Sequence, residues 1–399
     1  MLLLGFAPND VRVMREATAL RAAGFAVTII DMDRRPDGPR SEEIQGVSIQ
    51  HIRMPQWYQP SRVKLWFLVK LAIALLRIFG RSLRTPADIY HAHEEQVLLV
   101  GYLIARVKRK PLIFDAHELP LTDHSVTRWS GLHAMATWLL RRVVPSCAGV
   151  ITVSPPLADE IRRLYRSPEV TLVRNVPIYR AVEKQDRVRQ RLNLDQKTRI
   201  ALYQGYVLPD RGFDRLIRAA RFLEQDIVMV ILGPGPDEYF AELRNLIESE
   251  GVAERVKFLP AVPYAELLDW TASADLGLAI FPPDYSLSIR MCLPNKFFEY
   301  LMAGLPVLSS QLDVVVELIK AYDVGQVVPS LAPTDIAQTI NTMLSDPAAL
   351  ARMSANGKQA VLQEFNWGKE RVKLIQLYQK ITPLVYRKEK HSTVQAIKG

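Results

Sequence analysis

The chain has 399 residues, of which 49% are hydrophobic and 23% charged, so it is a globular protein too long for a single core. Only two cysteines occur, Cys147 and Cys292, which excludes a disulfide framework and a cysteine metal site and favours a reducing, cytoplasmic setting. The net charge of +9 leaves nucleic acid, an anionic membrane and phosphorylated ligands as candidate partners. No zinc-finger or RNA-recognition signature is present, so we expect no nucleic-acid partner.

Apolar runs and helical patterns alternate along the first half of the chain. Residues 2–7 lack the basic leader of a signal peptide, and we expect them to form a first buried strand. A helix is expected over 10–24, with Asp10 as its N-terminal cap and Gly24 at its end. Later strands are expected over 25–31, 87–93, 111–117, 149–154 and 170–175.

A second series of apolar runs follows a polar stretch over 177–198, which we expect to be a linker with a short helix. The strands expected there cover 200–204, 227–232, 256–259, 276–281, 306–309 and 325–328. Such alternation predicts parallel sheets covered by helices. The expected fold class is therefore α/β, with two doubly wound, Rossmann-like domains facing a cleft. Their expected boundaries are 1–178 and 199–382, with a linker at 179–198 and a polar tail at 383–399.

The segment 294–307 predicts a helix that carries one carboxylate and ends at a glycine. Pro294 suits a first turn, and Gly304 ends the helix. Lys296 and Glu299 are three residues apart, so they share a face near the positive end of the helix dipole, where backbone amides attract anions. A lysine adds charge for a phosphate, and a carboxylate can accept hydrogen bonds from a sugar diol. The alternative is a capped surface helix with an ordinary ion pair.

Unusual residues also follow other expected strands, at the end where doubly wound sheets bind ligands. Gly205 and Gly212 allow tight backbone after the strand at 200–204, and Arg211 can grip a diphosphate with two parallel hydrogen bonds. Gly233 opens a Gly-Pro-Gly-Pro turn where backbone can approach a ligand closely. No G-x-G-x-x-G follows the first strand and no G-K-[ST] loop occurs, which argues against a dehydrogenase and a P-loop NTPase.

Three histidines end two strands of the first half. His117 can hydrogen-bond a sugar hydroxyl or position the transferring group, and the alternative is a buried histidine with satisfied partners. His91 and His93 share one face of a strand with carboxylates nearby, which raises a metal site as an alternative. No further ligands follow with suitable spacing, so we expect no metal.

Taken together, these motifs resemble glycosyltransferase family 4, whose members have the GT-B fold. The resemblance is densest from about residue 200 to 328. It rests on the motifs at 204–214, 232–235, 258–264, 274–277 and 294–307. It implies transfer of a sugar from a UDP- or GDP-type nucleotide-diphospho-sugar to a saccharide or lipid-linked saccharide, in surface glycan assembly. It also implies retention of anomeric configuration, with no cofactor and no catalytic metal.

The same resemblance implies roles for single residues. Glu299 would bind the donor ribose, and Arg211 would bind the diphosphate. The nucleobase would be bordered by Ala261 and Val262, and His117 would lie near the reacting sugar. The remaining donor-side residues are Gly205, Gly233, Asn295 and Lys296, the catalytic set is His117, Arg211 and Lys296, and the acceptor-side residues are Asn9 and Asp10.

Two positions depart from the family pattern. The family often carries two glutamates separated by seven residues, but Met291 stands at the first position, which leaves the contacts of the donor sugar open. Tyr206 stands where an arginine is common, so Lys296 is expected to supply that charge, with Arg290 as a second candidate. A nucleotide-sugar epimerase of similar fold and a non-catalytic nucleotide-sugar-binding scaffold stay open as alternatives.

Residues 61–84 combine long apolar runs with basic residues and follow two aromatic residues, Trp57 and Tyr58. The basic residues that fall in one helical stripe are Lys70, Arg77, Arg81 and Arg84. Charge interrupts the run too often for a membrane-spanning helix. One interpretation is an interfacial helix on the anionic inner face of a membrane. The other is an ordinary covering helix whose basic side chains reach out to solvent.

Overall fold

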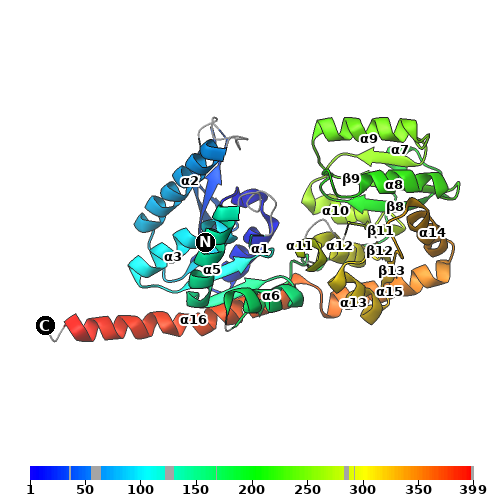
Figure 1. The fold of residues 1–399 in the computed structure, drawn as a ribbon. Helices are drawn as coiled ribbons and strands as arrows, with labels where there is room; N and C mark the ends of the chain where they lie inside the picture. The colour runs from blue at the N-terminus through cyan, green and yellow to red at the C-terminus, as the bar shows by residue number, and fades with distance from the viewer. Residues whose placement is uncertain are drawn as a thin grey trace. The chain divides into compact units, whose positions relative to one another are not determined.

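We analysed a computed structural model of the chain that describes residues 1–35, 37–54, 64–121, 130–167, 169–282, 287–291 and 293–396. The contacts divide the chain into two compact units. The first unit contains Met1–Arg174 together with Glu370–Gly399, and the second contains Asn175–Lys369. In each unit, helices cover a central sheet (Figure 1), which confirms the expected α/β fold class.

The strands described in the first unit are β1 (Thr28–Asp33), β2 (Ser41–Ile44), β3 (Val47–Arg53), β4 (Tyr90–His93), β5 (Leu112–Ala116), β6 (Gly149–Thr152) and β7 (Thr171–Leu172). They pair in the orders β2-β3-β1 and β4-β5-β6-β7. The β2–β3 pair is antiparallel and the other pairs are parallel. Leu2 joins the two parts, because it bridges Ile30 of β1 and Ala92 of β4.

The strand expected over 2–7 was wrong in extent, because regular pairing is limited to the bridge at Leu2. Beyond it, the Ala7 amide donates to the Asp31 side chain at 2.8 Å instead of to a neighbouring strand. The chain then forms the 3-10 turn η1 (Ala7–Asn9) that leads into the first helix. The β2–β3 hairpin was not among the expected elements. Its turn places Gln45 and Gly46 at positive φ, 54° and 77°.

The helices of the first unit are α1 (Val11–Ala22), α2 (Lys64–Arg84), α3 (Glu95–Lys108), α5 (Ser130–Val143), α6 (Pro155–Tyr165) and most of α16 (Trp367–Ala396), with the short turn η3 (Val144–Ser146). As expected, Asp10 caps α1, since its carboxylate accepts a hydrogen bond from the Val13 amide at 3.0 Å. Helix α3 packs against both α2 and α5. No helix in the described ranges is long and apolar enough to cross a membrane.

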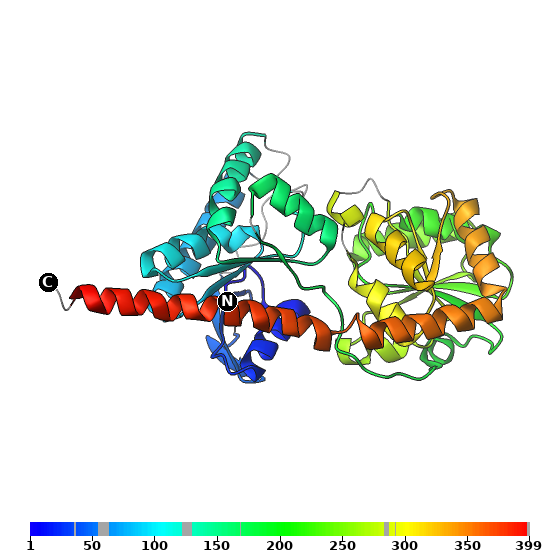
Figure 2. The same ribbon diagram turned by 90° about the horizontal axis from the view of Figure 1, so that it is seen from below.

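The part of α16 from Glu370 to Ile381 packs on the first unit, along which the red helix runs in Figure 2. Leu377 and Ile381 are buried against Gly149 of β6, where an added Cβ would lie 2.9 Å from Leu377. The expected boundary at 382 therefore differs from the division by contacts, because 370–382 bury their apolar face on the first unit. Helix α16 also continues to Ala396, through most of the stretch expected to be a polar tail.

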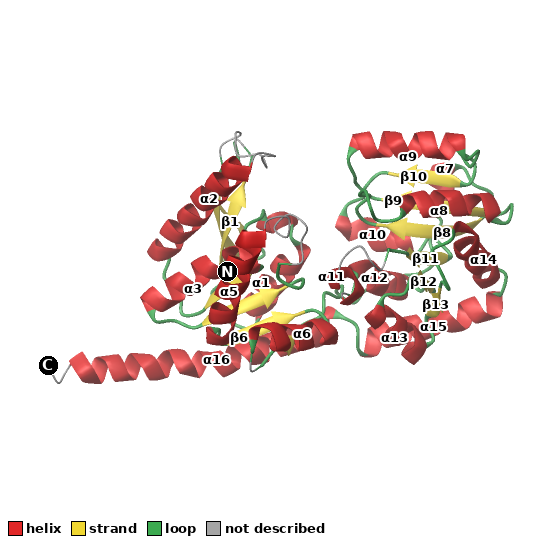
Figure 3. Cartoon of the chain, in the orientation of Figure 1, coloured by secondary structure: helices red, strands yellow, loops and turns green. Residues whose placement is uncertain are grey.

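The strands of the second unit are β8 (Arg199–Gln204), β9 (Ile227–Leu232), β10 (Val256–Leu259), β11 (Leu276–Ala279), β12 (Val307–Ser309) and β13 (Gly325–Val327). They form one parallel sheet in the order β10-β9-β8-β11-β12-β13 (Figure 3). Each lies within two residues of its expected range. The chain leaves β8 first toward β10 and later toward β13, so the strand order switches between β8 and β11.

The helices of the second unit are α7 (Arg187–Leu192), α8 (Phe213–Ala219), α9 (Asp237–Ser249), α10 (Tyr264–Thr271), α11 (Leu287–Met291), α12 (Asn295–Ala303), α13 (Asp313–Tyr322), α14 (Pro333–Leu344) and α15 (Pro347–Gln363), with the turn η4 (Ala220–Phe222). The short linker helix is α7. Helix α12 packs closely on the sheet, because a Cβ added at Gly277 would lie 2.4 Å from the ring of Tyr300. The Tyr300 hydroxyl also accepts a hydrogen bond from the backbone amide of Gln204 at 3.0 Å, which ties the helix to the end of β8.

Candidate functional site

Helix α12 carries Glu299 to the carboxyl end of β8, at the switch point of the second sheet. Helix residues 296–303 are all buried, so the alternative of a surface helix with an ordinary ion pair was wrong. The Glu299 carboxylate accepts from Gln204 Nε2 at 2.6 Å, and Gln204 Oε1 accepts from the Thr271 hydroxyl at 2.6 Å. This buried chain of hydrogen bonds fixes the orientation of the carboxylate. Gln204 and Thr271 were not among the predicted site residues.

Lys296 lies one turn before Glu299, with a buried ammonium group. Its Nζ is 3.4 Å from the centroid of the Tyr203 ring and 4.8 Å from that of Phe281, and it has no hydrogen-bond partner within the described part of the chain. Burial and the positive charge of Arg211 hold the pKa of Lys296 well below its ordinary value of 10.5, although Glu299 opposes them. A nearby anion would reverse this penalty, so the geometry suits an anionic ligand.

Arg211 is the second cation of this group. It directly precedes Gly212, which adopts φ +80° as it leads into α8. Its Nε atom is buried and makes no hydrogen bond with any described residue. Arg211 also acts electrostatically on the Tyr203 hydroxyl, whose pKa burial raises to about 12. Two neighbouring cations without an anion between them are the expected form of a phosphate or diphosphate site before its ligand binds.

Glycines shape the two turns beside these cations. Gly205 and Gly233 have φ values of +121° and +151°, which side chains rarely adopt. A Cβ at Gly233 would lie 2.1 Å from the Gly205 carbonyl oxygen, so the turns after β8 and β9 require glycine for their close approach. A Cβ at Gly205 would lie 3.4 Å from Lys296 Nζ. Lys296 Nζ therefore lies close to Gly205, and its replacement of the arginine charge missing at Tyr206 stays a prediction.

The other donor-side residues lie near the carboxyl ends of the same sheet. Ala261 and Asn295 are exposed, and Val262 is partly buried against the core. The second candidate for the missing charge, Arg290, instead pairs with Asp313 at 3.0 Å on the exposed surface. Nucleobase and sugar contacts of Ala261, Val262 and Asn295 stay predictions.

His117 belongs to the first unit, just after β5, and both of its ring nitrogens face carboxylates. Nδ1 is 3.0 Å from Glu94 and Nε2 is 3.0 Å from Asp115. Burial lowers the pKa of His117, but the two carboxylates outweigh it and hold that pKa well above the ordinary 6.5. Both ring nitrogens therefore have partners, as in the alternative of a buried histidine with satisfied partners. The side chain is nevertheless 17% exposed. It is an oriented imidazolium with access to the surface.

Arg12 holds this histidine in place through Asp115. Its guanidinium donates from Nε and Nη2 to the two carboxylate oxygens of Asp115, at 3.0 and 2.8 Å, and from Nη1 to the Val173 carbonyl at 3.0 Å. Burial raises the pKa of Asp115, but Arg12 and His117 outweigh that effect and keep it well below its usual value. Sequence analysis did not find Arg12. The available signal was its place in one helical stripe with Glu16 and Ala19, four and seven residues later.

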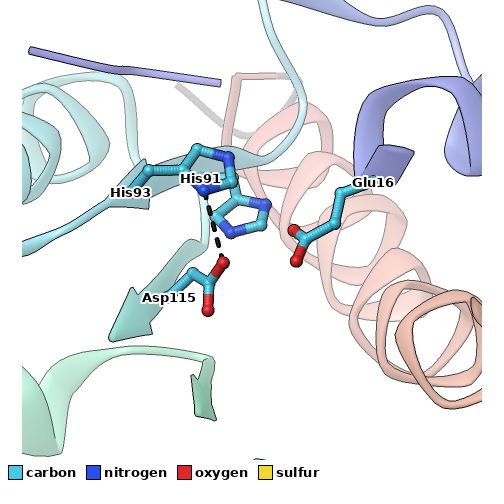
Figure 4. A group of neighbouring side chains, drawn as sticks. All are labelled: Glu16, His91, His93 and Asp115. Carbon is cyan, nitrogen blue, oxygen red and sulfur yellow. Dashed lines mark ion pairs between the residues drawn. The ribbon is translucent and has the colours of Figure 1, made fainter. Parts of the chain in front are cut away.

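Asp115 also belongs to a group of four buried side chains that could hold a metal ion (Figure 4). One ligand atom from each of Glu16, His91, His93 and Asp115 lies within 4.8 Å of the others. Figure 4 shows the Glu16 carboxylate pointing from α1 toward the two imidazoles, which stack with ring centroids 4.2 Å apart.

The two carboxylates of this group already pair with a cation of the protein, Arg12. Arg12 Nη2 lies 3.0 Å from Glu16 and 2.8 Å from Asp115. Burial and the nearby Asp115 raise the pKa of Glu16 to about 8, so its proton can take the place of a second cation. We therefore assign no metal to these residues.

The two acceptor-side residues lie at the start of α1. Asn9 is exposed, while the Asp10 carboxylate is engaged in capping the helix. In α2, which carries the basic stripe, Arg77 donates a hydrogen bond to the Arg53 carbonyl at 3.0 Å. Arg81 donates to Gln50 Oε1 at 2.8 Å. Part of the stripe therefore serves the unit's own packing. The aromatic residues Trp57 and Tyr58 lie outside the described residues.

Comparison with known proteins agrees with these two units. The model for Glycosyltransferase Family 4 matches residues 10–176, and the model for Glycosyl transferases group 1 matches residues 184–360. The chain belongs to the family 4 glycosyltransferases. Its fold is the GT-B fold, as expected.

Relatives and solved structures span nearly the whole of this glycosyltransferase. D-inositol 3-phosphate glycosyltransferase 1 of Catenulispora acidiphila is 26% identical over 92% of this chain and 90% of its own. Sucrose-phosphate synthase from Thermosynechococcus elongatus superposes with a TM-score of 0.78, at 17% identity, over 96% of this chain and 98% of its own. Anabaena HepE in complex with UDP-glucose superposes with a TM-score of 0.71, at 16% identity, over 95% and 98%.

Proposed function

We propose that this glycosyltransferase moves a sugar from a UDP- or GDP-type nucleotide-diphospho-sugar to a saccharide or lipid-linked saccharide, in surface glycan assembly. The observation that carries the proposal is the pair of cations, Lys296 and Arg211, at the switch point beside the buried carboxylate of Glu299. A diphosphate supplies the missing anion, and a ribose supplies hydroxyl donors for the carboxylate. The UDP-glucose complex of the similarly folded HepE supports this type of donor.

In this proposal, binding and catalysis use the same charges. Negative charge grows on the leaving diphosphate as the glycosidic carbon separates from its oxygen. Lys296 and Arg211 stabilise that charge, and Lys296 gains most, because an anion restores its depressed pKa. Cations supplied by the chain take the part that a metal ion plays elsewhere, so we propose metal-independent transfer. Retention of anomeric configuration is proposed from the family resemblance.

We assign His117 to the reacting sugar. Asp115 holds the imidazolium through Nε2, and Nδ1 can exchange its hydrogen bond with Glu94 for one to a sugar hydroxyl. The acceptor-side role of Asn9 and Asp10 belongs to the same proposal. A lipid-linked acceptor would be met at an anionic membrane, so peripheral contact through 61–84 is part of it as well.

Product analysis with labelled donors tests this function. The protein is incubated with UDP- and GDP-sugars and a panel of saccharide acceptors, with and without EDTA, and the products are separated by mass spectrometry. We expect a new glycoside, whose formation EDTA does not reduce, and thermal stabilisation by the matching nucleoside diphosphate. An isomerised donor would identify an epimerase. Nucleotide binding without any product across the panel would favour a scaffold.

A further inference from the structure

A small hollow lies on the surface of the second unit, away from the donor-side residues. It has a volume of about 270 Å³ and lies between the turn that precedes β9 and an exposed face of α14. Arg199 and Glu224 pair at 2.7 Å where β8 begins, and the Ile227 amide at the start of β9 donates to the Glu224 carbonyl. The hollow therefore lies at the amino end of the sheet, whereas Glu299 lies at its carboxyl end.

The turn that forms one wall of the hollow is fixed by a side chain of α14. Asn341 Nδ2 donates to the Phe222 carbonyl at 2.9 Å, and Asn341 Oδ1 accepts from the Glu224 amide at 3.1 Å. These bonds hold the Phe222 ring in the wall, where it is 50% exposed. Single exposed rings are common on protein surfaces, but this one lines a concave site and so offers an apolar face to a ligand.

Neutral hydrogen-bonding side chains form the other wall. Thr334, Gln338 and Thr342 follow one another at intervals of four, so they share one face of α14. All three are exposed, which leaves their groups available to a ligand. A side-chain amide can donate and accept hydrogen bonds, and a hydroxyl can do the same. The hollow thus combines an aromatic ring on one side with a row of uncharged donors and acceptors on the other.

We propose that this hollow binds a neutral saccharide and is a second sugar site, separate from the site of transfer. One face of a pyranose ring carries mainly C–H groups, which can pack on the exposed Phe222 ring. The hydroxyl groups at the edge of the sugar then exchange hydrogen bonds with Thr334, Gln338 and Thr342. The volume is close to that of the smallest ordinary ligand pockets, about 300 Å³, so it suits one sugar ring and not a nucleotide-sugar.

The charge of the lining favours an uncharged ligand. Although the chain has a net charge of +9, Glu224 is the only charged residue among the described residues that line the hollow, and it pairs with Arg199. A phosphate or an acidic sugar would meet that carboxylate and find no unpaired cation in the lining. A neutral glycan held here stays near the enzyme between transfers, which raises the local concentration of its chain ends. The proposal goes beyond sugar transfer, and the binding does not depend on it.

Saturation-transfer difference NMR tests the proposal without any sugar donor. The full chain is titrated with three neutral probes, maltohexaose, cellohexaose and chitohexaose, and we expect it to bind at least one of them. Phe222→Ser should weaken that binding by about tenfold, because the apolar platform is lost. Phe222→Tyr keeps the ring and should bind as the parent does. Gln338→Ala should weaken binding severalfold through the loss of one hydrogen-bonding group.

A matched control removes an exposed aromatic ring elsewhere. Trp138 of the first unit is 54% exposed, and Trp138→Ser should leave saccharide binding unchanged. Melting curves establish that each variant is folded, and Gln338→Ala keeps the test decisive if Phe222→Ser is not. Transfer to a short acceptor should survive in both variants, because the donor residues lie at the other end of the sheet.

Three outcomes would overturn the proposal. The first is a parent chain that binds none of the three probes. The second is binding by Phe222→Ser and Gln338→Ala that equals binding by the parent, since the probe then occupies another site. The third is a parent dimer, seen by light scattering, that Phe222→Ser abolishes, since a second copy of the chain is then the occupant of the hollow. A parent that binds a probe but transfers no sugar would contradict the proposed function and leave this site supported.

Discussion

The two units place charged groups at equivalent ends of their sheets but treat them in opposite ways. In the second unit, Lys296 and Arg211 lie together with only the carboxylate of Glu299 to oppose them, and the pKa of Lys296 is depressed. In the first unit, Arg12 is paired with Asp115, and His117 lies between two carboxylates that raise its pKa. A site that awaits a charged ligand carries unbalanced charge, whereas a site that orients a side chain balances its charge internally.

The largest effect on stability should come from breaking the buried Arg12–Asp115 pair of the first unit. Asp115→Asn removes the bidentate carboxylate of the buried Arg12 guanidinium and leaves it only Glu16, which should lower the free energy of unfolding by about 3–5 kcal/mol. Urea denaturation followed by circular dichroism measures the change. The matched control is Glu160→Gln, which breaks an exposed pair with Arg163 and should change little. Equal losses in the two variants would show that burial does not set the value of the Arg12–Asp115 pair.

Changes at the Lys296–Arg211 site of the second unit should lower activity much more than stability. Arg211→Ala should lower kcat by about 100-fold, because charge on the leaving diphosphate is then less stabilised. Its melting temperature should fall far less than its kcat, since Arg211 Nε makes no hydrogen bond with a described residue and the only described partner of the side chain is Tyr203. Steady-state kinetics and thermal melting check the two halves of this prediction. Parallel loss of kcat and melting temperature would make Arg211 a structural residue.

Lys296 offers a test through proton linkage. Between its depressed pKa and 10.5 the unfolded chain binds a proton that the folded chain lacks, so this lysine's penalty on stability should shrink as pH rises toward 10.5. Lys296→Met should remove that pH dependence and bind nucleoside diphosphates about tenfold more weakly. Calorimetry in alkaline buffers of different ionisation enthalpy should detect proton uptake on nucleotide binding by the parent only. No proton uptake by the parent would mean that its Lys296 is charged before the ligand arrives.

The role of Glu299 can be isolated with a modified ligand. Glu299→Gln should weaken binding of the nucleoside diphosphate by roughly tenfold, since a neutral amide accepts more weakly from the ribose than a carboxylate. The parent should discriminate against the 2′,3′-dideoxy nucleotide, and the variant should discriminate much less. If both proteins lose the same factor on removal of the two hydroxyls, Glu299 does not contact the ribose.

The smallest expected effect is the pH dependence of stability that His117 contributes in the first unit. The folded-state pKa of His117 is raised, so its pairing stabilises the fold fully below about pH 6.5 and loses this contribution as pH rises through the raised pKa. His117→Gln should therefore cost most melting temperature in acid and progressively less in alkaline buffer. A melting difference that is constant with pH would assign the loss to packing.

Local patterns predicted the second unit well. Its six strands and the helix at 294–307 carry their own signals: continuous apolar runs, a proline at the helix start and Gly304 at its end, with φ +76°. The sequence also predicted that Glu299, Lys296 and Arg211 would meet, because residues that follow parallel strands share one edge of the sheet. It did not predict that Gln204 and Thr271 would fix Glu299, since polar residues in apolar segments give no sign of their partner.

By itself, the sequence determined the α/β class, the strand series of the second unit, the family and the residues that gather at the second sheet. Only the tertiary structure decided which charges are paired. Arg12 reaches Asp115 across 103 residues, and the Tyr378 hydroxyl meets His91 Nδ1 across 287 residues at 2.8 Å. The structure likewise placed residues 370–382 in the first unit, although the sequence had assigned them to the second. Period and composition report which face of an element is apolar, whereas the partner of a buried charge is set by long-range packing that no local pattern records.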